Sequence, residues 1–291
     1  MNRLDAYRAL MRVDKPIGTW LLAWPTFWAL LIAAHGDPSV RLVVIFAVGV
    51  FLMRSAGCVI NDFADRNIDG KIARTKDRPL AAKKVTSTEA LVLFVVLISL
   101  AFLLVLTLNK LTMVLSFVAA ALAIIYPFMK RITHGPQFIL GAAFSMAIPM
   151  AFAAATNSIP LIAWILFAAN LTWTVAYDTE YAMVDRTDDL LAGVKSTAVI
   201  TGKWDVAFIA GLQLITLALL AWVGAIINAT PFYWLGLAAM AVLFLWQLVL
   251  IRNRDADACF LAFRQNHYAG MLFALGLALH YWLPLPFGVS V

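Results

Sequence analysis

Charged side chains are scarce in this sequence. Asp, Glu, Lys and Arg make up 13% of its 291 residues, whereas hydrophobic residues make up 63%. Soluble globular domains average roughly 25% charged residues and about 45–50% apolar residues. The composition therefore argues against an ordinary soluble enzyme.

Cysteine is almost absent as well. Only Cys58 and Cys259 are present, in an apolar stretch and a predicted polar loop, and they form neither a disulfide framework nor a zinc-type Cys/His pattern. A dense basic run is also missing, although the formal net charge is +6. A nucleic-acid-binding protein is thus disfavoured, and we expect no nucleic-acid partner.

Long apolar runs dominate what the sequence does contain. A membrane-spanning helix needs about 20 mostly apolar residues, and a helix satisfies its own backbone hydrogen bonds in lipid. We therefore expect an all-α polytopic protein surrounded by membrane lipid. No low-complexity linker divides the chain, so we predict one integral membrane domain, 1–291. Nine stretches qualify as spans: 16–34, 42–62, 90–108, 111–129, 136–155, 159–177, 206–227, 231–251 and 268–287.

Lys and Arg are distributed unequally between alternate loops. On one side of the predicted membrane, the loops contain only Arg41 and Lys110. Short loops rich in Lys and Arg remain on the cytoplasmic side of a membrane, so we predict a cytoplasmic N-terminus and a periplasmic C-terminus. The remaining loop Lys and Arg, nineteen in all, lie in segments 1–15, 63–89, 130–135, 178–205 and 252–267.

Two of the predicted cytoplasmic loops are long. They are 63–89 and 178–205, and they follow the second and sixth spans. This offset of four spans predicts two related four-helix bundles with a ninth helix added. Because nearly all polar residues fall on this side, we expect the active site on the cytoplasmic face.

Acidic residues and an amide lie at the end of the second span. If that helix continues beyond the membrane, 100° per residue places Asn61, Asp65 and Asp69 within about 80° of one another. Like charges one turn apart repel, so a stabilising partner is expected. Oxygen ligands on one face suit Mg²⁺, which takes one or two carboxylates and fills its other positions with water and substrate phosphates.

A second acidic stripe follows the sixth span. The same arithmetic places Asp178, Asp185 and Asp189 within about 40° of one another. Two facing stripes would hold Mg²⁺ ions around a diphosphate. The alternative is that each stripe is a solvated helix end, but their repetition four spans apart favours a shared site.

Basic residues accompany the acids. Arg74 and Arg78 follow the first stripe, while Lys130 and Arg131 follow Tyr126 at the end of the fourth span. Lys binds diphosphate oxygens as a point charge and Arg as a bidentate fork, so we expect these residues to contact substrate. The alternative is a topological role, because any cytoplasmic loop collects positive charge.

Arg54 lies about two turns inside the second span. An arginine at the centre of a membrane helix costs roughly 2.5–3.5 kcal/mol on insertion scales and normally faces a cavity or a partner. It precedes Asn61 by seven residues and shares its helical face. We therefore predict that Arg54 binds a carboxylate or phosphate below the first stripe. Snorkelling to the membrane interface is the alternative.

The spacing of these residues resembles that of a known family, the UbiA-type intramembrane prenyltransferases. The similarity extends over nearly the whole chain, including the nine spans and both long loops. It is carried by the motifs Asn61-Asp62-x-x-Asp65-x-x-x-Asp69, Arg74-Thr75-x-x-Arg78-Pro79 and Tyr181-x-x-x-Asp185-x-x-x-Asp189.

The resemblance implies an enzyme of a bacterial inner membrane. Such an enzyme transfers a polyprenyl group from a polyprenyl diphosphate to an acceptor and releases diphosphate. Segments 12–20, 177–186 and 193–198 favour 4-hydroxybenzoate as the acceptor. Prenylation would then occur at the ring carbon ortho to the phenol, as ubiquinone synthesis requires.

The resemblance also implies roles for individual residues. Asp65, Asp185 and Asp189 are expected in catalysis, with Asp185 or Asp189 the candidate to receive or polarise the phenol proton. Arg54 would hold the benzoate carboxylate. The implied Mg²⁺ ligands are Asn61, Asp65, Asp69, Asp185 and Asp189. The other implied substrate-binding residues are Arg12, Arg74, Arg78, Tyr126, Lys130, Arg131, Asp178 and Tyr181.

Two other functions remain open from the sequence. Haem-type and naphthoquinone-type prenyltransferases share the acidic motifs and differ in their acceptor. A cation-coupled transporter would also contain repeats and intramembrane charge, but it would carry them near mid-membrane on broken helices. Here the acids lie at span ends, which favours the enzyme.

Overall fold

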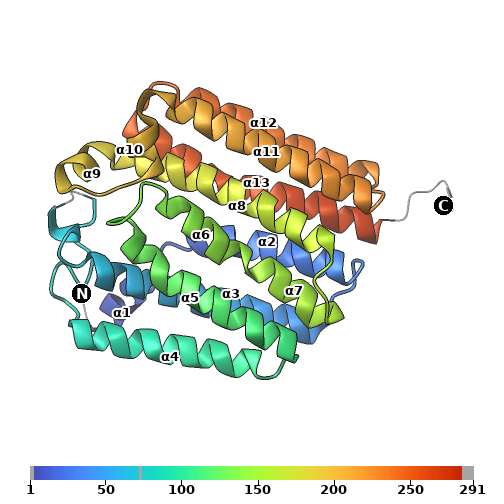
Figure 1. The fold of residues 1–291 in the computed structure, drawn as a ribbon, viewed down its shortest axis with the longest axis horizontal. Coiled ribbons are helices and arrows are strands. Elements are labelled where there is room, and N and C mark those ends of the chain that lie inside the picture. Colours follow the sequence, from blue (N-terminus) through green and yellow to red (C-terminus); the bar gives the residue numbers. More distant parts are fainter. Residues whose placement is uncertain (1–2, 72–73, 284–291) are drawn as a thin grey trace.

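The computed structural model describes residues 3–71 and 74–283, and the regular elements in these ranges are all helical. Figure 1 shows the long helices running side by side as one bundle. In chain order the helices are α1 (Arg3–Leu10), α2 (Ile17–Ala33), α3 (Val40–Asp65), η1 (Asp69–Lys71), α4 (Ser87–Val105), α5 (Lys110–Met129), α6 (Pro136–Ser145), α7 (Ala147–Thr156), α8 (Leu161–Val184), α9 (Arg186–Ala192), α10 (Thr197–Thr201), η2 (Gly202–Trp204), α11 (Asp205–Ile226), α12 (Pro231–Ile251) and α13 (Ala256–Trp282).

Polar caps determine where several helices begin. At α4 the Thr86 hydroxyl accepts a hydrogen bond from the Glu89 N–H at 3.2 Å, and Glu89 accepts one from the Thr86 N–H at 2.8 Å. At α5 the Asn109 side chain accepts a bond from the Thr112 N–H at 2.9 Å. These caps satisfy first-turn N–H groups that have no acceptor within the helix.

Length and composition qualify seven helical stretches of the described chain as membrane spans. The 17-residue α2 is shorter. The 27-residue α13 carries Asp257, Arg264 and His267 in its first half and is not among the seven. The seven are Val40–Asp65, Ser87–Val105, Lys110–Met129, Pro136–Thr156, Leu161–Val184, Thr197–Ile226 and Pro231–Ile251.

The predicted beginning of the last helix is wrong. We expected a loop over 252–267 and a span over 268–287, but α13 begins at Ala256. Asp255 caps it by accepting a hydrogen bond from the Ala258 N–H at 2.9 Å. The first three turns were missed because Asp257 and the polar residues from Arg264 to His267 interrupt the apolar run. The predicted residues 284–287 lie outside the described ranges.

The fifth predicted span consists of two helices. α6 ends at Ser145 and α7 begins at Ala147. Pro149 explains the interruption, because proline has no N–H to donate to the carbonyl of Ser145. The buried Ser145 hydroxyl accepts a hydrogen bond from Asn170 of α8 at 2.9 Å, which anchors the interruption to its neighbour.

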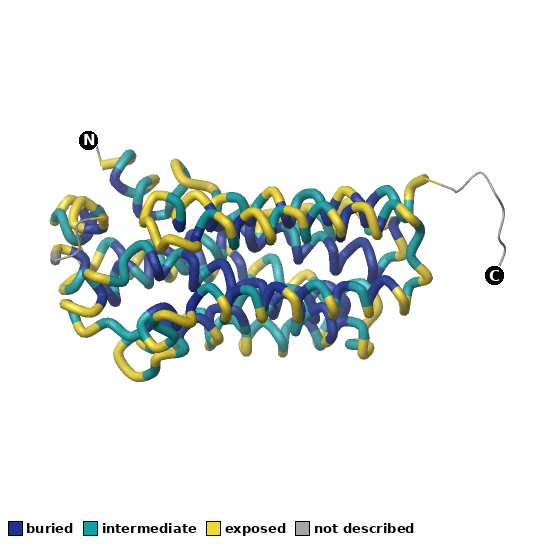
Figure 2. The backbone as a smooth tube through the Cα atoms, turned by 90° about the horizontal axis from the view of Figure 1, so that it is seen from above, coloured by how far each residue is buried: buried dark blue, intermediate teal, exposed yellow. Residues whose placement is uncertain are grey.

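α13, the helix expected in addition to two four-helix bundles, packs against α12 and also contacts both α2 and α8. Trp28 of α2 stacks on Trp173 of α8 at 5.3 Å between ring centroids and meets Phe273 of α13 edge-on at 4.8 Å. These rings are fully buried and form the centre of the core. Figure 2 shows buried residues along the middle of the bundle.

α12 and α13 pack unusually closely through two glycines. A Cβ built on Gly236 would lie 2.9 Å from the Cα of Gly276. No residue larger than glycine fits there without separating the helices, because both contacts involve backbone atoms. The close approach fixes α13 along its second half.

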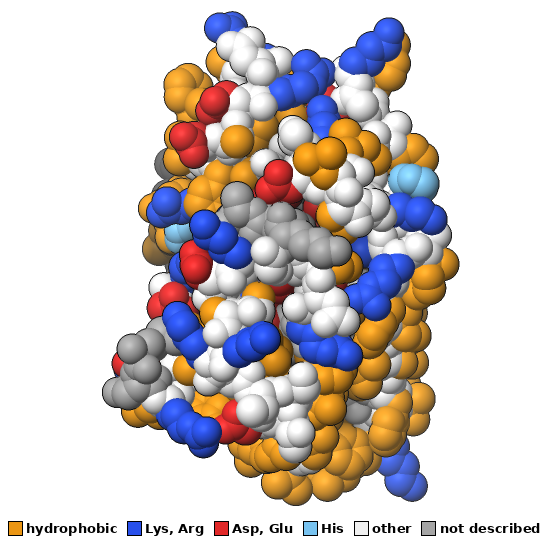
Figure 3. Space-filling model, turned by 90° about the vertical axis from the view of Figure 1, so that its left-hand side faces the viewer, with side chains coloured by type: hydrophobic (Ala, Val, Ile, Leu, Met, Phe, Trp, Pro, Cys, Tyr) orange, Lys and Arg blue, Asp and Glu red, His pale blue; other side chains and the backbone are white. Residues whose placement is uncertain are grey.

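The two long connections meet at one end of the bundle. Figure 1 places α1, α9 and α10 at this end, together with the chain that follows α3. A hydrogen bond of 2.8 Å from Arg74 Nε to Asp185 joins the two connections. Figure 3 shows many Lys and Arg side chains on this face with acidic side chains among them.

Candidate active site

A cavity of about 1720 Å³ opens between α2, α3, α5, α8 and α13. It brings together side chains that are far apart in the sequence, from the N-terminal segment to α13. Every residue that the sequence singled out for the site lines it: Arg12, Arg54, Asn61, Asp65, Asp69, Arg74, Arg78, Tyr126, Lys130, Arg131, Asp178, Tyr181, Asp185 and Asp189.

The first acidic group differs in geometry from the predicted stripe. α3 ends at Asp65, so Asp69 does not continue its helical face and instead begins the short helix η1. Asn61 and Asp65 remain one turn apart on α3. Asp69 is buried and reaches the same cavity from the following turn. The residues predicted as a stripe therefore converge through a change of chain direction.

The second acidic group is also interrupted. α8 ends at Val184, Asp185 has the non-helical backbone angles φ −100° and ψ 6°, and Asp189 lies on the separate helix α9. One continuous helix was expected. The break directs α9 across the end of the bundle, and Asp178, Asp185 and Asp189 still line one cavity.

Lys130 connects α5 to the first acidic group. Its Nζ donates a hydrogen bond to Asp65 Oδ2 at 2.9 Å and to Asn61 Oδ1 at 3.3 Å. The Nζ also lies 5.9 Å from the centroid of the Tyr126 ring. Arg131 points elsewhere and donates to the backbone carbonyl of Ala64. Lys130 is thus a cation of the cavity, whereas Arg131 also holds the end of α3.

Arg74 connects the first long connection to the second acidic group. Its Nε donates to both oxygens of Asp185 at 2.8 and 3.1 Å, and a terminal nitrogen donates to the Tyr181 hydroxyl. The guanidinium carbon lies 4.5 Å from the Tyr181 ring centroid. A planar guanidinium makes this combination of bidentate and stacking contacts, which an ammonium group cannot reproduce.

Asp62 is an acidic residue that the site prediction missed. Its carboxylate is almost fully buried and accepts hydrogen bonds from Arg12 at 2.9 and 3.0 Å, and Arg78 Nη1 lies 3.2 Å from Oδ1. The same Arg78 nitrogen donates to both oxygens of Asp69 at 3.1 and 3.0 Å. A charged residue inside a predicted span is the signal that indicated Arg54, and it applies equally to Asp62.

Burial and neighbouring charge alter the ionisation of the cavity side chains. Burial raises the pKa of the Asp69 carboxyl, although Arg78 opposes this. Burial and the nearby Asp185 raise the pKa of Asp189 to about 6. Burial would lower the pKa of Lys130, but the Asp65 carboxylate raises it overall. Additional positive charge in the cavity would therefore favour the ionised form of both aspartates.

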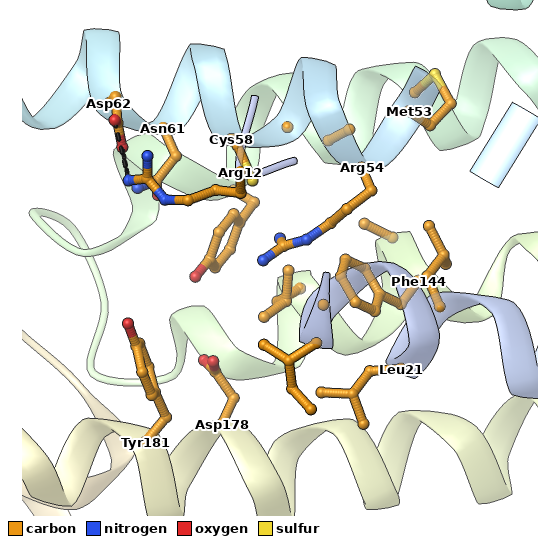
Figure 4. A pocket seen from close by; sticks show the side chains of 18 of the residues that line it. Arg12, Leu21, Met53, Arg54, Cys58, Asn61, Asp62, Phe144, Asp178 and Tyr181 are labelled. Atoms are coloured by element: carbon orange, nitrogen blue, oxygen red, sulfur yellow. Dashed lines mark hydrogen bonds and ion pairs between the residues drawn. The ribbon is translucent and has the colours of Figure 1, made fainter. Parts of the chain in front are cut away.

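Arg54 extends from α3 into the deeper part of the cavity. Figure 4 shows its side chain between α3 and the helices opposite, with Phe144 beside it and Asp178 across the cavity. The guanidinium carbon lies 5.9 Å from the Phe144 ring centroid. Among the described residues, no hydrogen bond or ion pair involves this guanidinium. Arg54 therefore lines the cavity.

The oxygen donors of the cavity fit a hard divalent cation. Within the described ranges, no group of three His, Cys, Asp or Glu side chains is placed to hold a metal ion by itself. A cation bound there would need oxygens from water or from a second molecule. Hard divalent cations are commonly bound in this way, by one or two carboxylates together with substrate phosphates.

Apolar side chains form the remaining walls of the cavity. Those from α3, α4 and α5 include Phe46, Val50, Ile98, Phe102 and Ala119, and α2 and α6 contribute others. The polar part of the cavity is therefore continuous with a hydrophobic part between membrane-length helices. The first half of α13 also contributes Phe263, Gln265, His267 and Tyr268. The first three of these fall in the predicted loop 252–267.

Comparisons with known proteins agree with this architecture. The model of the UbiA prenyltransferase family matches residues 22–275. A 4-hydroxybenzoate octaprenyltransferase of Idiomarina loihiensis is 56% identical over 282 residues, which cover 97% of this chain and 100% of that protein.

Solved structures share the fold. The apo structure of a UbiA homolog from Aeropyrum pernix K1 superposes with a TM-score of 0.79 at 21% identity and covers 88% of this chain and 96% of that one. A UbiA homolog from Archaeoglobus fulgidus bound to GPP and Mg²⁺ gives a TM-score of 0.70 at 16% identity, covering 94% and 99%. An intramembrane helical bundle with a cavity of paired acids and cations defines the class, and the chain belongs to the UbiA prenyltransferase family. The motif-based prediction of the family is confirmed.

Proposed function

We propose that this protein transfers a polyprenyl group from a polyprenyl diphosphate to 4-hydroxybenzoate in ubiquinone biosynthesis. The allylic C–O bond breaks, a C–C bond forms at the ring carbon ortho to the phenol, and the ring proton and diphosphate leave. The observation that carries the proposal is that both acidic motifs and their cations line one cavity that continues between apolar walls. Relatives of 56% identity named as 4-hydroxybenzoate octaprenyltransferases support the acceptor.

The polar part of the cavity is assigned to the diphosphate. Mg²⁺ would be held by Asn61, Asp65, Asp69, Asp185 and Asp189, and when bound it neutralises the charge that develops on the departing diphosphate. Arg74, Arg78 and Lys130 would bind diphosphate oxygens directly, with Arg12, Tyr126, Arg131, Asp178 and Tyr181 around them. All of these residues line the cavity. Four of them already pair with its acids, namely Arg12, Arg74, Arg78 and Lys130.

The deeper part of the cavity is assigned to the aromatic acceptor. Arg54 would bind the benzoate carboxylate through a bidentate pair, because its guanidinium faces the cavity and has no carboxylate partner among the described side chains. The phenol end would then lie toward the junction of α8 and α9, where Asp185 or Asp189 would receive or polarise the phenol proton. The apolar walls would accommodate the polyprenyl chain and open toward membrane lipid.

The proposal includes a membrane arrangement. The chain forms a single domain over 1–291 that crosses a bacterial inner membrane nine times, with α2 and α13 added to the seven long apolar stretches. The end that carries α1, α9 and α10 faces the cytoplasm, because nineteen Lys and Arg lie in the connections at that end. The N-terminus would be cytoplasmic and the C-terminus periplasmic.

Reconstitution tests the function directly. Purified protein in detergent is incubated with radiolabelled 4-hydroxybenzoate, a polyprenyl diphosphate and Mg²⁺, and the product is extracted into organic solvent. We expect label in the organic phase only when all three are present. Prenyl transfer to a naphthoate or haem acceptor, with 4-hydroxybenzoate left unprenylated, would overturn the acceptor assignment.

A further inference from the structure

Gly18 lies directly against the guanidinium of Arg54. A Cβ built on Gly18 would lie 2.2 Å from Nε, 2.3 Å from Nη2 and 2.4 Å from Cζ of Arg54. These distances are far below van der Waals contact, so the guanidinium occupies the space that any side chain at position 18 would need. Gly18 also lines the cavity, at the second residue of α2.

The backbone of α2 does not itself require glycine at this position. Gly18 lies within a helix and is not among the residues with positive φ. Glycine within a helix is less favourable than alanine because it loses more conformational freedom. The demand that these distances place on position 18 is therefore space for Arg54.

The surroundings of Gly18 are electropositive. The amino end of α2 carries the positive end of the helix dipole. Pro16 occupies the N-cap position and makes no side-chain hydrogen bond, and no described residue accepts a bond from the N–H of Ile17 or Gly18. The guanidinium of Arg54 adds a full positive charge to this end, and no described carboxylate pairs with it. Two positive groups are therefore in contact on one side of the cavity, with Asp178 on the other side, and they favour a bound anion beside them.

We propose that Gly18 is a specificity-determining residue that positions Arg54 for the acceptor carboxylate, an inference that rests on the proposed function. By having no side chain, Gly18 lets the guanidinium lie on the first turn of α2, so that Arg54 and the helix end face the same carboxylate. A methyl group at position 18 displaces the guanidinium. Arg54 then keeps its charge, but its guanidinium no longer lies where it can bind the acceptor carboxylate.

The substitution Gly18→Ala tests this without disrupting the fold. The displaced atoms are the far end of a flexible side chain, so they can move while α2 stays in place. We expect the KM for 4-hydroxybenzoate to rise by about 10-fold or more, which corresponds to a lost charge-assisted pair. The KM for the polyprenyl diphosphate and the kcat at saturating acceptor should stay within about twofold of the wild type. The Tm should not fall, because alanine favours helix.

Gly211→Ala is the matched control. Gly211 also lies within a helix, has nothing within 4 Å of a built Cβ and does not line the cavity. It should leave both KM values unchanged. In a double-mutant cycle, Gly18→Ala should add less than about twofold to the loss in kcat/KM caused by Arg54→Ala, because its effect acts through that side chain.

Two results would overturn the assignment. One is an unchanged KM for 4-hydroxybenzoate in Gly18→Ala, and the other is a full additional loss on top of Arg54→Ala. Phenol, which has no carboxylate, provides a further check. In Gly18→Ala, its KM should rise less than that of 4-hydroxybenzoate. Failure of the proposed function is seen separately, as wild-type protein that does not prenylate 4-hydroxybenzoate.

Discussion

The Nζ atom of Lys130 lies 2.9 Å from Oδ2 of Asp65, across the interface between α5 and α3. The pair brings a cation from the fourth predicted span to an acid from the second. The hydrogen bond from Arg74 to Asp185 joins the two long connections in the same way. Acids proposed to bind metal are thus held by cations proposed to bind diphosphate, and substrate binding would exchange these partners.

Removal of one acid from either group should abolish activity without unfolding the protein. Asp65→Ala and Asp185→Ala each delete a carboxylate that lines the cavity and that we propose as a metal ligand, rather than a residue of the apolar core. We expect turnover to fall by at least about 100-fold at saturating Mg²⁺, measured by transfer of radiolabelled 4-hydroxybenzoate.

Asp37→Ala is the control for this experiment, because Asp37 is exposed and does not line the cavity. Its rate should equal that of the wild type. Wild-type rates in either Asp65→Ala or Asp185→Ala would remove the two-group metal site from consideration.

Substitution of Arg54 should affect the acceptor rather than the prenyl donor. Arg54→Lys keeps the charge but cannot reproduce the bidentate fork, and Arg54→Ala removes both. Loss of a charge-assisted pair is worth roughly 1.5–3 kcal/mol, or about a 10- to 150-fold decrease in kcat/KM for 4-hydroxybenzoate. Steady-state kinetics with each substrate varied in turn measures the effect. A lower affinity for the diphosphate instead would assign Arg54 to the diphosphate region.

Membrane orientation can be measured by cysteine labelling. Both native cysteines are buried, so Cys58 and Cys259 are first replaced by alanine. Ser158→Cys and Lys84→Cys then introduce exposed thiols at opposite ends of the bundle. We expect a membrane-impermeant maleimide to label position 158 in intact cells and position 84 only after permeabilisation. The reverse pattern would place the cavity mouth on the periplasmic side.

Asp205 should be important for stability. Its side chain is fully buried and pairs with Arg186 of α9 and with Arg254, whose Nε lies 3.0 and 3.1 Å from its two oxygens. Asp205→Ala leaves both arginines unpaired. We expect a loss of about 2–3 kcal/mol, less than the 3–5 kcal/mol of a fully buried pair because both arginines are partly exposed. Thermal unfolding in detergent measures it.

Asp257→Ala serves as the control for Asp205, because Asp257 is exposed in the first turn of α13 and its loss should cost only a few tenths of a kcal/mol. Equal Tm values for the two variants would contradict the stabilising role of Asp205. Arg186 directly follows Asp185, so Asp205→Ala should also weaken the apparent affinity for Mg²⁺.

Helix positions followed closely from the sequence where apolar runs were uninterrupted. The predicted spans 111–129 and 231–251 agree with α5 and α12 to within one residue. The prediction failed for α13, because charged and polar residues interrupt the apolar run over its first three turns. The cap formed by Asp255 was a usable signal, since an aspartate before a helical stretch is a typical N-cap.

The composition of the candidate site was predictable, but its geometry was not. Residue spacing brought Asn61 and Asp65 to one face because they share a helix. The position of Asp69 could not be predicted in this way, because the 100° per residue argument assumes that the helix continues and does not show where α3 ends. The pairing of Arg12 with Asp62 depends on how α1 and α2 pack beside α3, and charge alone does not choose among many possible partners.

The pairing of acids with the protein's own cations has a consequence for handling the enzyme. Because Asp62, Asp65 and Asp185 are already neutralised by Arg12, Lys130 and Arg74, the fold does not depend on dissolved ions to hold these carboxylates apart. A chelator should therefore abolish the activity of the enzyme without changing its melting temperature or helical content. Readdition of the cation should restore the full rate without a refolding lag.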